Sequence, residues 1–245
     1  MTIGSELKDH YEHGYADYSL AEWRSMGAEH KAANIMQLCQ SLAHDKILEI
    51  GAGDGAVMEG LRKNNFGREW HALEISESAV ELIGRKGFAA QVFDGGTLPQ
   101  PDKFFDLVIL SHVVEHLEHP RILLAEAARV GSHVCVEVPL LLTARLKDED
   151  VFHPVGHINF YTARTARMLL LSVGYEVIAT RVDNPPRSVL AYSMGRWKGS
   201  FIWWMRELGL RLAPGLATKV FCYHYAMVGK PKASAAIFKP ADAQR

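Results

Sequence analysis

The chain of 245 residues is 48% hydrophobic with a formal net charge of −1 at pH 7, which suits one globular domain with an added segment, or two small domains, and gives no reason to expect nucleic-acid binding. Its three cysteines lie far apart and form no C-x-x-C pair, which argues against a disulfide framework and favours a reducing compartment. The polar first residues lack a signal-peptide core and no apolar run reaches the roughly 20 residues that cross a bilayer, so we expect a cytoplasmic protein.

The predicted elements change character at residue 46. Residues 1–45 are polar and rich in aromatic side chains, and we expect a helical lid with a helix over 27–43. Beyond them short apolar runs alternate with amphipathic stretches, which predicts strands at 46–50, 70–75, 89–93, 105–111 and 133–138 and helices at 55–64, 77–86 and 120–129. This alternation is typical of a parallel sheet with helices on both faces.

The second half of the chain adds fewer, longer segments. A helix over 162–173 and a strand over 175–182 complete a core that we place at 46–182. An insertion, 183–219, precedes the last strand, 220–230, in which VFCYHYAMV carries the strand pattern. We expect the tail, 231–245, to be flexible.

A glycine turn follows the first predicted strand in ILEIGAGDGA. Gly51, Gly53 and Gly55 would let the backbone bend tightly and approach a ligand over a helix N-terminus. The stretch also satisfies the dinucleotide pattern G-x-G-x-x-(G/A), and Glu74 falls about 20 residues on, where a ribose-binding acid belongs. By this pattern alone, an NAD-dependent oxidoreductase is an open alternative.

Two acids at the turn favour a different ligand. Glu49 precedes the first glycine by two residues and Asp54 lies inside the turn, so a pyrophosphate would meet like charges. S-adenosylmethionine carries an ammonium and a sulfonium, and these acids would attract it. The alternative is structural, with Glu49 pinning the loop and Asp54 capping the helix.

Several ordered motifs then resemble one family. LEIGAGDG, Glu74, VFDG and FDLVILSHVVEHLEHP look like successive motifs of class I S-adenosylmethionine-dependent methyltransferases. The similarity is closest to the branch of ubiquinone-biosynthesis O-methyltransferases and small-molecule or glycan methyltransferases, and GHINFYTARTARMLLLSVGYEV resembles that branch's downstream segment. The resemblance covers 46–182 and the last strand. It implies a doubly wound, Rossmann-like α/β fold with seven mostly parallel strands, the last antiparallel.

The resemblance also implies roles by position. Around the turn, Glu49, Gly51, Ala52 and Gly53 would hold the methionine part of the cofactor, and Ser111 would lie beside its sulfonium. The adenosine would meet Glu74, Ile75, Asp94 and Gly95, with Glu74 on the ribose hydroxyls. Arg24, in the expected lid, could clamp the cofactor carboxylate or be a solvated helix residue.

The stretch SHVVEHLEHP is the candidate for catalysis or metal binding. The resemblance places it at the carboxyl end of the fourth strand, facing the methyl group. Some relatives bind a divalent ion with Glu-x-x-Glu-His and a later histidine. Here His112 replaces the first glutamate, beside Glu115, His116 and the later His157. A metal on these four residues is therefore an alternative that we do not favour; a loop-ordering role is the other.

Histidine is the expected general base because its pKa lies near neutrality. His112, His116, His153 and His157 are the candidates. We favour His157, because GHINFYT resembles the family segment that turns back to the site. A hydrogen-bonded structural imidazole remains the alternative for each.

The insertion 183–219 carries six basic and two acidic residues, a net charge of +4, together with three tryptophans. This mixture is typical of a helix on an anionic membrane, a pocket wall or a homodimer contact, and it lacks the long basic stripe of a nucleic-acid site. We predict methyl transfer from S-adenosylmethionine, leaving S-adenosylhomocysteine, to oxygen of a small-molecule or glycan- or lipid-linked acceptor. A non-catalytic cofactor-binding protein is a further alternative.

Overall fold

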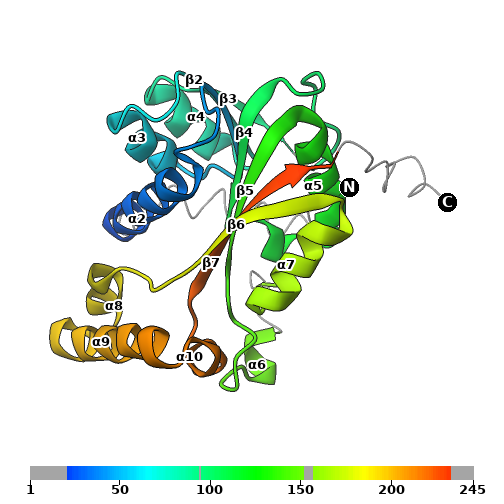
Figure 1. The fold of residues 1–245 in the computed structure, drawn as a ribbon. Helices are drawn as coiled ribbons and strands as arrows, with labels where there is room; N and C mark the ends of the chain where they lie inside the picture. The colour runs from blue at the N-terminus through cyan, green and yellow to red at the C-terminus, as the bar shows by residue number, and fades with distance from the viewer. Residues whose placement is uncertain (1–20, 94, 152–156, 233–245) are drawn as a thin grey trace.

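The computed structural model describes residues 21–93, 95–151 and 157–232. Within them the strands form a single mixed sheet in the order β3-β2-β1-β4-β5-β7-β6 (Figure 1). Only β7 runs antiparallel to its neighbours, which confirms the predicted fold class. The strands are β1 (Lys46–Ile50), β2 (Glu69–Glu74), β3 (Ala89–Val92), β4 (Phe105–Ser111), β5 (Gly131–Pro139), β6 (Tyr175–Asp183) and β7 (His224–Pro231).

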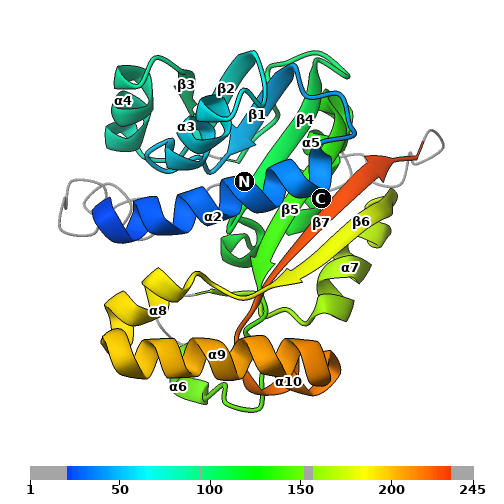
Figure 2. The same ribbon diagram turned by 60° about the vertical axis from the view of Figure 1, so that its left-hand side comes forward.

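Helices cover both faces of the sheet, and Figure 2 shows α2 lying across one of them. The helices α2, α3 and α4 pack on one apolar cluster, and α5 and α7 pack on the other. The helices of this core are α2 (Ala21–Cys39), α3 (Ala56–Lys63), α4 (Glu77–Arg85), α5 (Pro120–Val130) and α7 (Ala163–Ser172), with a 3₁₀ turn, η2 (Val114–His116), and a short helix, α6 (Asp148–Val151).

The central strands are apolar on both sides because both of their faces are covered. In β1, Ile47 packs in the cluster beneath α2 and α3, whereas Leu48 packs in the cluster beneath α5 and α7. Successive side chains of a strand point to opposite faces, so a run such as FDLVILS supplies both layers at once.

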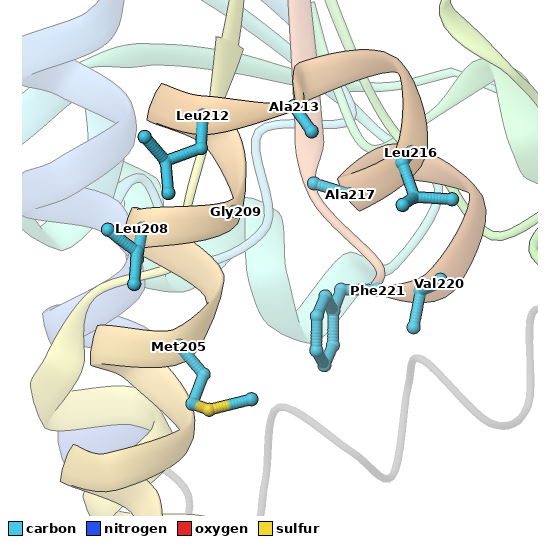
Figure 3. A pocket seen from close by; sticks show the side chains of 9 residues that line it. All are labelled: Met205, Leu208, Gly209, Leu212, Ala213, Leu216, Ala217, Val220 and Phe221. Carbon is cyan, nitrogen blue, oxygen red and sulfur yellow. The ribbon is translucent and has the colours of Figure 1, made fainter.

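The insertion folds into three helices beyond the carboxyl end of β6 (Figures 1 and 2): α8 (Arg187–Met194), α9 (Arg196–Leu212) and α10 (Pro214–Val220). The chain leaves the sheet at Asp183 and returns at His224, which lie opposite each other in β6 and β7. Between α9 and α10 lies an apolar groove of about 290 Å³ (Figure 3).

Several element boundaries differ from the sequence-based prediction. The last strand begins at His224, later than the predicted residue 220, because α10 continues to Val220 and the Phe221 N–H still donates to the Ala217 carbonyl. The first described helix ends at Cys39, before the predicted residue 43. None of the helices in the described part of the chain is long and apolar enough to span a membrane.

Candidate active site

Three glycines bend the chain between β1 and α3. Gly51, Gly53 and Gly55 have φ angles of 71°, 59° and 75°, in the left-handed region that glycine adopts without steric cost. At Gly51 a Cβ would lie 2.5 Å from Cγ2 of Val113, so the backbone packs too closely for any side chain. The Gly53 N–H donates to Oε2 of Glu74 over 2.8 Å. The acid at the end of β2 thus fixes the shape of the turn.

A cavity of about 520 Å³ opens beside this turn, at the carboxyl ends of β1, β4 and β5. Eight of the predicted site residues line it: Glu49, Gly51, Ala52, Gly53, Ser111, His112, His116 and His157. Predicted contacts of the adenosine, Glu74, Ile75 and Gly95, are not among its lining residues. Asp94, His153 and the side chain of Arg24 lie outside the described residues. The site that the sequence predicted is therefore brought together in large part.

Glu49 is an acid strongly affected by its surroundings. Its side chain is buried in the cavity wall, and its Oε2 has no hydrogen-bond partner within the described residues. Burial raises its pKa to about 8, and Lys31 opposes this rise while Glu74 and Asp54 add to it. At neutral pH the carboxyl group therefore carries a proton until a cation approaches.

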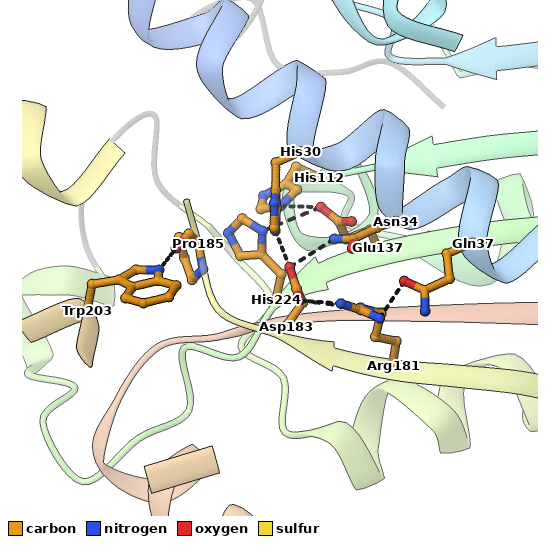
Figure 4. Close-up of polar contacts among 10 residues, drawn as sticks. All are labelled: His30, Asn34, Gln37, His112, Glu137, Arg181, Asp183, Pro185, Trp203 and His224. Carbon is orange, nitrogen blue, oxygen red and sulfur yellow. Dashed lines mark hydrogen bonds and ion pairs between the residues drawn. The ribbon is translucent and has the colours of Figure 1, made fainter. Parts of the chain in front are cut away.

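His112 lies directly after β4, between the buried carboxylates of Glu115 and Glu137, the second of which is drawn in Figure 4. Its Nε2 is 3.2 Å from Oε1 of Glu137, and its Nδ1 is 3.3 Å from Oε1 of Glu115. Burial opposes the imidazolium, but the two carboxylates overcome this and raise the pKa of His112. Burial likewise opposes ionisation of Glu137, yet its hydrogen bond to His112 lowers the pKa of Glu137 to about 2. The two carboxylates therefore favour the charged form of the His112 imidazole.

His157 is placed in the cavity by the segment that follows it. The N–H groups of Ile158 and Asn159 donate to the Glu115 carbonyl over 3.0 and 2.9 Å, and the Asn159 side-chain amide donates to the Leu117 carbonyl over 2.7 Å. Nε2 of His157 then lies 3.9 Å from Oε1 of Glu115. Burial lowers the pKa of His157, although Glu115 opposes this, so the imidazole is neutral at physiological pH.

Sequence reasoning missed Glu137 and His224. Nδ1 of His224 lies 3.5 Å from Oε1 of Glu137, and its ring stacks edge-on against that of His112 with centroids 4.6 Å apart. Burial and the charge on His112 lower the pKa of His224 to about 3, against the effect of Glu137. The available signal was a polar residue inside each of two apolar strands, HVCVEV and CYHYAMV.

The helix α2 closes over this site through one partly buried acid (Figure 4). Asp183, the last residue of β6, pairs with His30 and accepts a hydrogen bond from the Asn34 amide over 3.0 Å. Arg181 adds an ion pair to Asp183 over 3.1 Å and donates to the Gln37 side chain over 2.6 Å. Lys31, on the same helix, lines the cavity. These contacts attach α2 to the sheet edge.

Two groups of side chains within the described residues could hold a metal ion. Glu115, His116 and His157 form one group, and His112, Glu137 and His224 form the other, each with its ligating atoms within 4.8 Å of one another. The four residues considered together from the sequence thus divide between two groups, with His112 in the second. Imidazole and carboxylate together suit zinc, iron or manganese better than magnesium.

With this geometry in place, comparison with known proteins identifies the chain. The profile of the methyltransferase domain family matches residues 20–180, more than half of the chain. The chain belongs to this methyltransferase family. The match confirms the predicted class, an S-adenosylmethionine-dependent methyltransferase, over the oxidoreductase alternative.

Curated relatives of this methyltransferase include ubiquinone/menaquinone biosynthesis C-methyltransferases named UbiE. That of Paraburkholderia phytofirmans is 29% identical over 126 residues, which cover 47% of this chain and 51% of the relative. That of Burkholderia multivorans is 32% identical over 95 residues, which cover 35% and 38%. The chain spans about half the length of the Paraburkholderia relative that it matches.

Solved structures share the fold of this methyltransferase at low identity. A methyltransferase in complex with the Haloferax volcanii Trm112 activator is 16% identical with a TM-score of 0.61, over 94% of this chain and 100% of that one. A geranyl diphosphate methyltransferase in complex with GPP and sinefungin is 11% identical with a TM-score of 0.61, over 83% and 78%. These likenesses concern the fold alone.

Proposed function

We propose that this methyltransferase transfers the methyl group of S-adenosylmethionine to a hydroxyl oxygen of a small-molecule or glycan- or lipid-linked acceptor. The observation that carries the proposal is a single cavity lined by both Glu49, a buried acid beside a glycine turn, and His157, a neutral imidazole. The first suits the cationic cofactor, and the second suits removal of the acceptor's proton.

The residues at the turn fit the cofactor on physical grounds. Buried oxygens of Glu49 and Ser111 have no hydrogen-bond partner in the described chain, and an unpartnered buried polar atom is costly. An ammonium group would supply the partner that Glu49 lacks, with Gly51, Ala52 and Gly53 against the methionine part. We assign the adenosine to Glu74, Ile75, Asp94 and Gly95, and the cofactor carboxylate to Arg24.

When bound, S-adenosylmethionine supplies a methyl group on a positively charged sulfur, which leaves alignment and proton removal to the protein. His157 accepts the proton of the acceptor hydroxyl, and Glu115, 3.9 Å from its Nε2, stabilises the imidazolium that forms. Glu115 and Glu137 flank His112 and favour its charged form, which makes it a poorer proton acceptor, so we assign it the role of positioning the acceptor. The ring of His116 lies 4.7 Å from that of His157, so we assign His116 to the same part of the cavity wall that would contact the acceptor.

Transfer to carbon is the second candidate. The curated relatives are named C-methyltransferases, and removal of a phenolic proton also makes the adjacent ring carbon more nucleophilic. The same base, His157, would therefore serve either outcome. The acceptor's shape and its orientation toward the methyl group would decide between oxygen and carbon.

Methyl-labelled S-adenosylmethionine, offered with a panel of phenols, hydroquinones and lipid-linked hydroxyl compounds, tests the proposal. NMR of the product separates an O-methyl from a C-methyl group. We expect His157→Asn to abolish labelling while S-adenosylhomocysteine still binds by calorimetry, with NADH as the non-binding control. Full turnover in His157→Asn would refute the base, and binding of NADH in place of S-adenosylhomocysteine would refute the cofactor assignment.

A further inference from the structure

The side of α9 that faces the protein carries several small or polar residues. A Cβ at Gly199 would lie 2.3 Å from the Leu190 carbonyl oxygen, so α8 and α9 are in close backbone contact there. Ser200 is buried and accepts a hydrogen bond from Arg187 over 2.9 Å. The buried guanidinium of Arg206 lies 5.0 Å above the ring of Tyr223. Gly199, Ser200 and Arg206 thus lie on the inner face, together with the partly buried Trp203 and Leu210.

The outer face of α9 is apolar and exposed. Trp197 is 88% exposed, Phe201 66% and Leu212 76%, and Trp204 and Leu208 are also more than half exposed. Successive members of this set are four, three, four and four residues apart, which places them on one side of the helix. In most surface helices such an apolar stripe packs against the core, whereas on α9 the stripe faces solvent. Contiguous exposed apolar surface of this kind marks an interaction site.

The groove between α9 and α10 continues this apolar surface. Met205, Leu208 and Leu212 of α9 face Leu216 and Val220 of α10 across it (Figure 3). Leu216 is itself 64% exposed. We call this surface the α9 face: it consists of the exposed stripe Trp197, Phe201, Trp204, Leu208 and Leu212 and of the adjoining groove, which could accommodate an inserted apolar group.

Basic residues border the α9 face. Arg196, Lys198, Arg211 and Lys219 are exposed, and the one acid on α9, Glu207, is paired with Arg211 over 3.3 Å. Aromatic and aliphatic side chains bordered by cations are complementary to a bilayer with anionic headgroups. Against a second copy of the chain, the same border would meet its own positive charge.

We infer that the α9 face docks on an anionic lipid bilayer, with Trp197, Phe201 and Trp204 entering the interface and the basic border meeting the headgroups. α9 packs directly on α8, whose Val189 and Leu190 line the active-site cavity. A docked bilayer therefore lies one helix away from the cavity. The inference does not depend on which acceptor the enzyme uses.

Co-sedimentation of the full chain with vesicles tests the inference. We expect binding to vesicles of phosphatidylcholine with phosphatidylglycerol, weak binding to phosphatidylcholine alone, and a loss of binding at high salt. Each basic residue removed from the border should weaken binding about fivefold, so Lys198→Glu with Arg211→Glu should reduce it well beyond tenfold. Trp204→Ser with Leu208→Ser should also abolish it. Met168→Ser, at an exposed apolar position on α7, is the matched control and should bind normally.

Brominated lipids give a second, independent readout. Insertion of Trp197 and Trp204 should let these lipids quench the protein's fluorescence, and Trp197→Phe with Trp204→Phe should keep binding while losing most of the quenching. Equal binding to neutral and anionic vesicles would overturn the inference. Vesicle binding that the α9 variants leave unchanged would also overturn it. A third contrary result would be a native chain that does not bind vesicles but forms a concentration-dependent dimer in sedimentation velocity, if the Trp204→Ser, Leu208→Ser variant dissociates that dimer.

Discussion

Glu49 should make cofactor binding depend on pH. Below its pKa of about 8 the carboxyl group is protonated, and it must lose that proton before it can pair with an ammonium ion. Each pH unit below the pKa costs about 1.4 kcal/mol of binding free energy. The affinity for S-adenosylhomocysteine should therefore rise about tenfold between roughly pH 6 and pH 7, while the ligand's own amine stays charged.

Isothermal titration calorimetry measures this linkage directly. Titrations in two buffers of different ionisation enthalpy give the number of protons released, which should approach one per ligand at neutral pH. Glu49→Gln should remove both the pH slope and the proton release. Asp54→Asn is the matched control, because Asp54 lines the same cavity and its loss should leave the slope intact. An affinity that is flat with pH in the native chain, with no proton exchange, would refute the reasoning.

Further predictions concern the proposed base His157, the glycine turn, and the cluster of His112, Glu137 and His224. His157→Asn should lower turnover by about 10²–10⁴-fold with unchanged S-adenosylhomocysteine affinity, measured by single-turnover kinetics and calorimetry. Gly51→Ala should lose cofactor binding, since its Cβ would lie 2.5 Å from Val113; Val113→Ala alone should bind. Folding lowers the pKa of His224 from 6.5 to about 3 and that of Glu137 from 4.5 to about 2. Within these pH ranges the unfolded chain binds more protons than the folded one, so the free energy of unfolding should decrease as the pH falls through them. His224→Gln should flatten the upper part of that loss in denaturant titrations. Exhaustive chelation should leave turnover unchanged, and recovery only with an added divalent ion would contradict this.

The grouping of residues around the glycine turn was predictable because its signals are local. The glycine turn, the acid two residues before it and the polar residues after β4 all follow a strand end directly in the chain. In a parallel sheet these ends meet at one edge, so Glu49, Gly51 and His112 could be placed together from order alone.

The cluster of His112, Glu137 and His224 could not be predicted, because its members come from strands that are neighbours in the sheet but distant in the chain. His224 reaches Glu137 only because β7 enters the sheet antiparallel between β5 and β6. The split of the histidines into two groups depends on the φ of 59° at His112, a backbone conformation that no residue pattern marked. For α9, the sequence showed tryptophan mixed with arginine, but the choice of inner face rests on the close approach at Gly199.

The helical insertion begins and ends at a single rung of the sheet, since Asp183 and His224 are paired across adjacent strands. Residues 184–223 thus leave and re-enter the sheet at the same point, and Ala217 and Tyr223 anchor them in the core. An exchange of these helices would change the part of the cavity wall that Val189 and Leu190 form, while the glycine turn after β1 stayed in place. The same junction is the natural place to graft a foreign acceptor-binding segment by design.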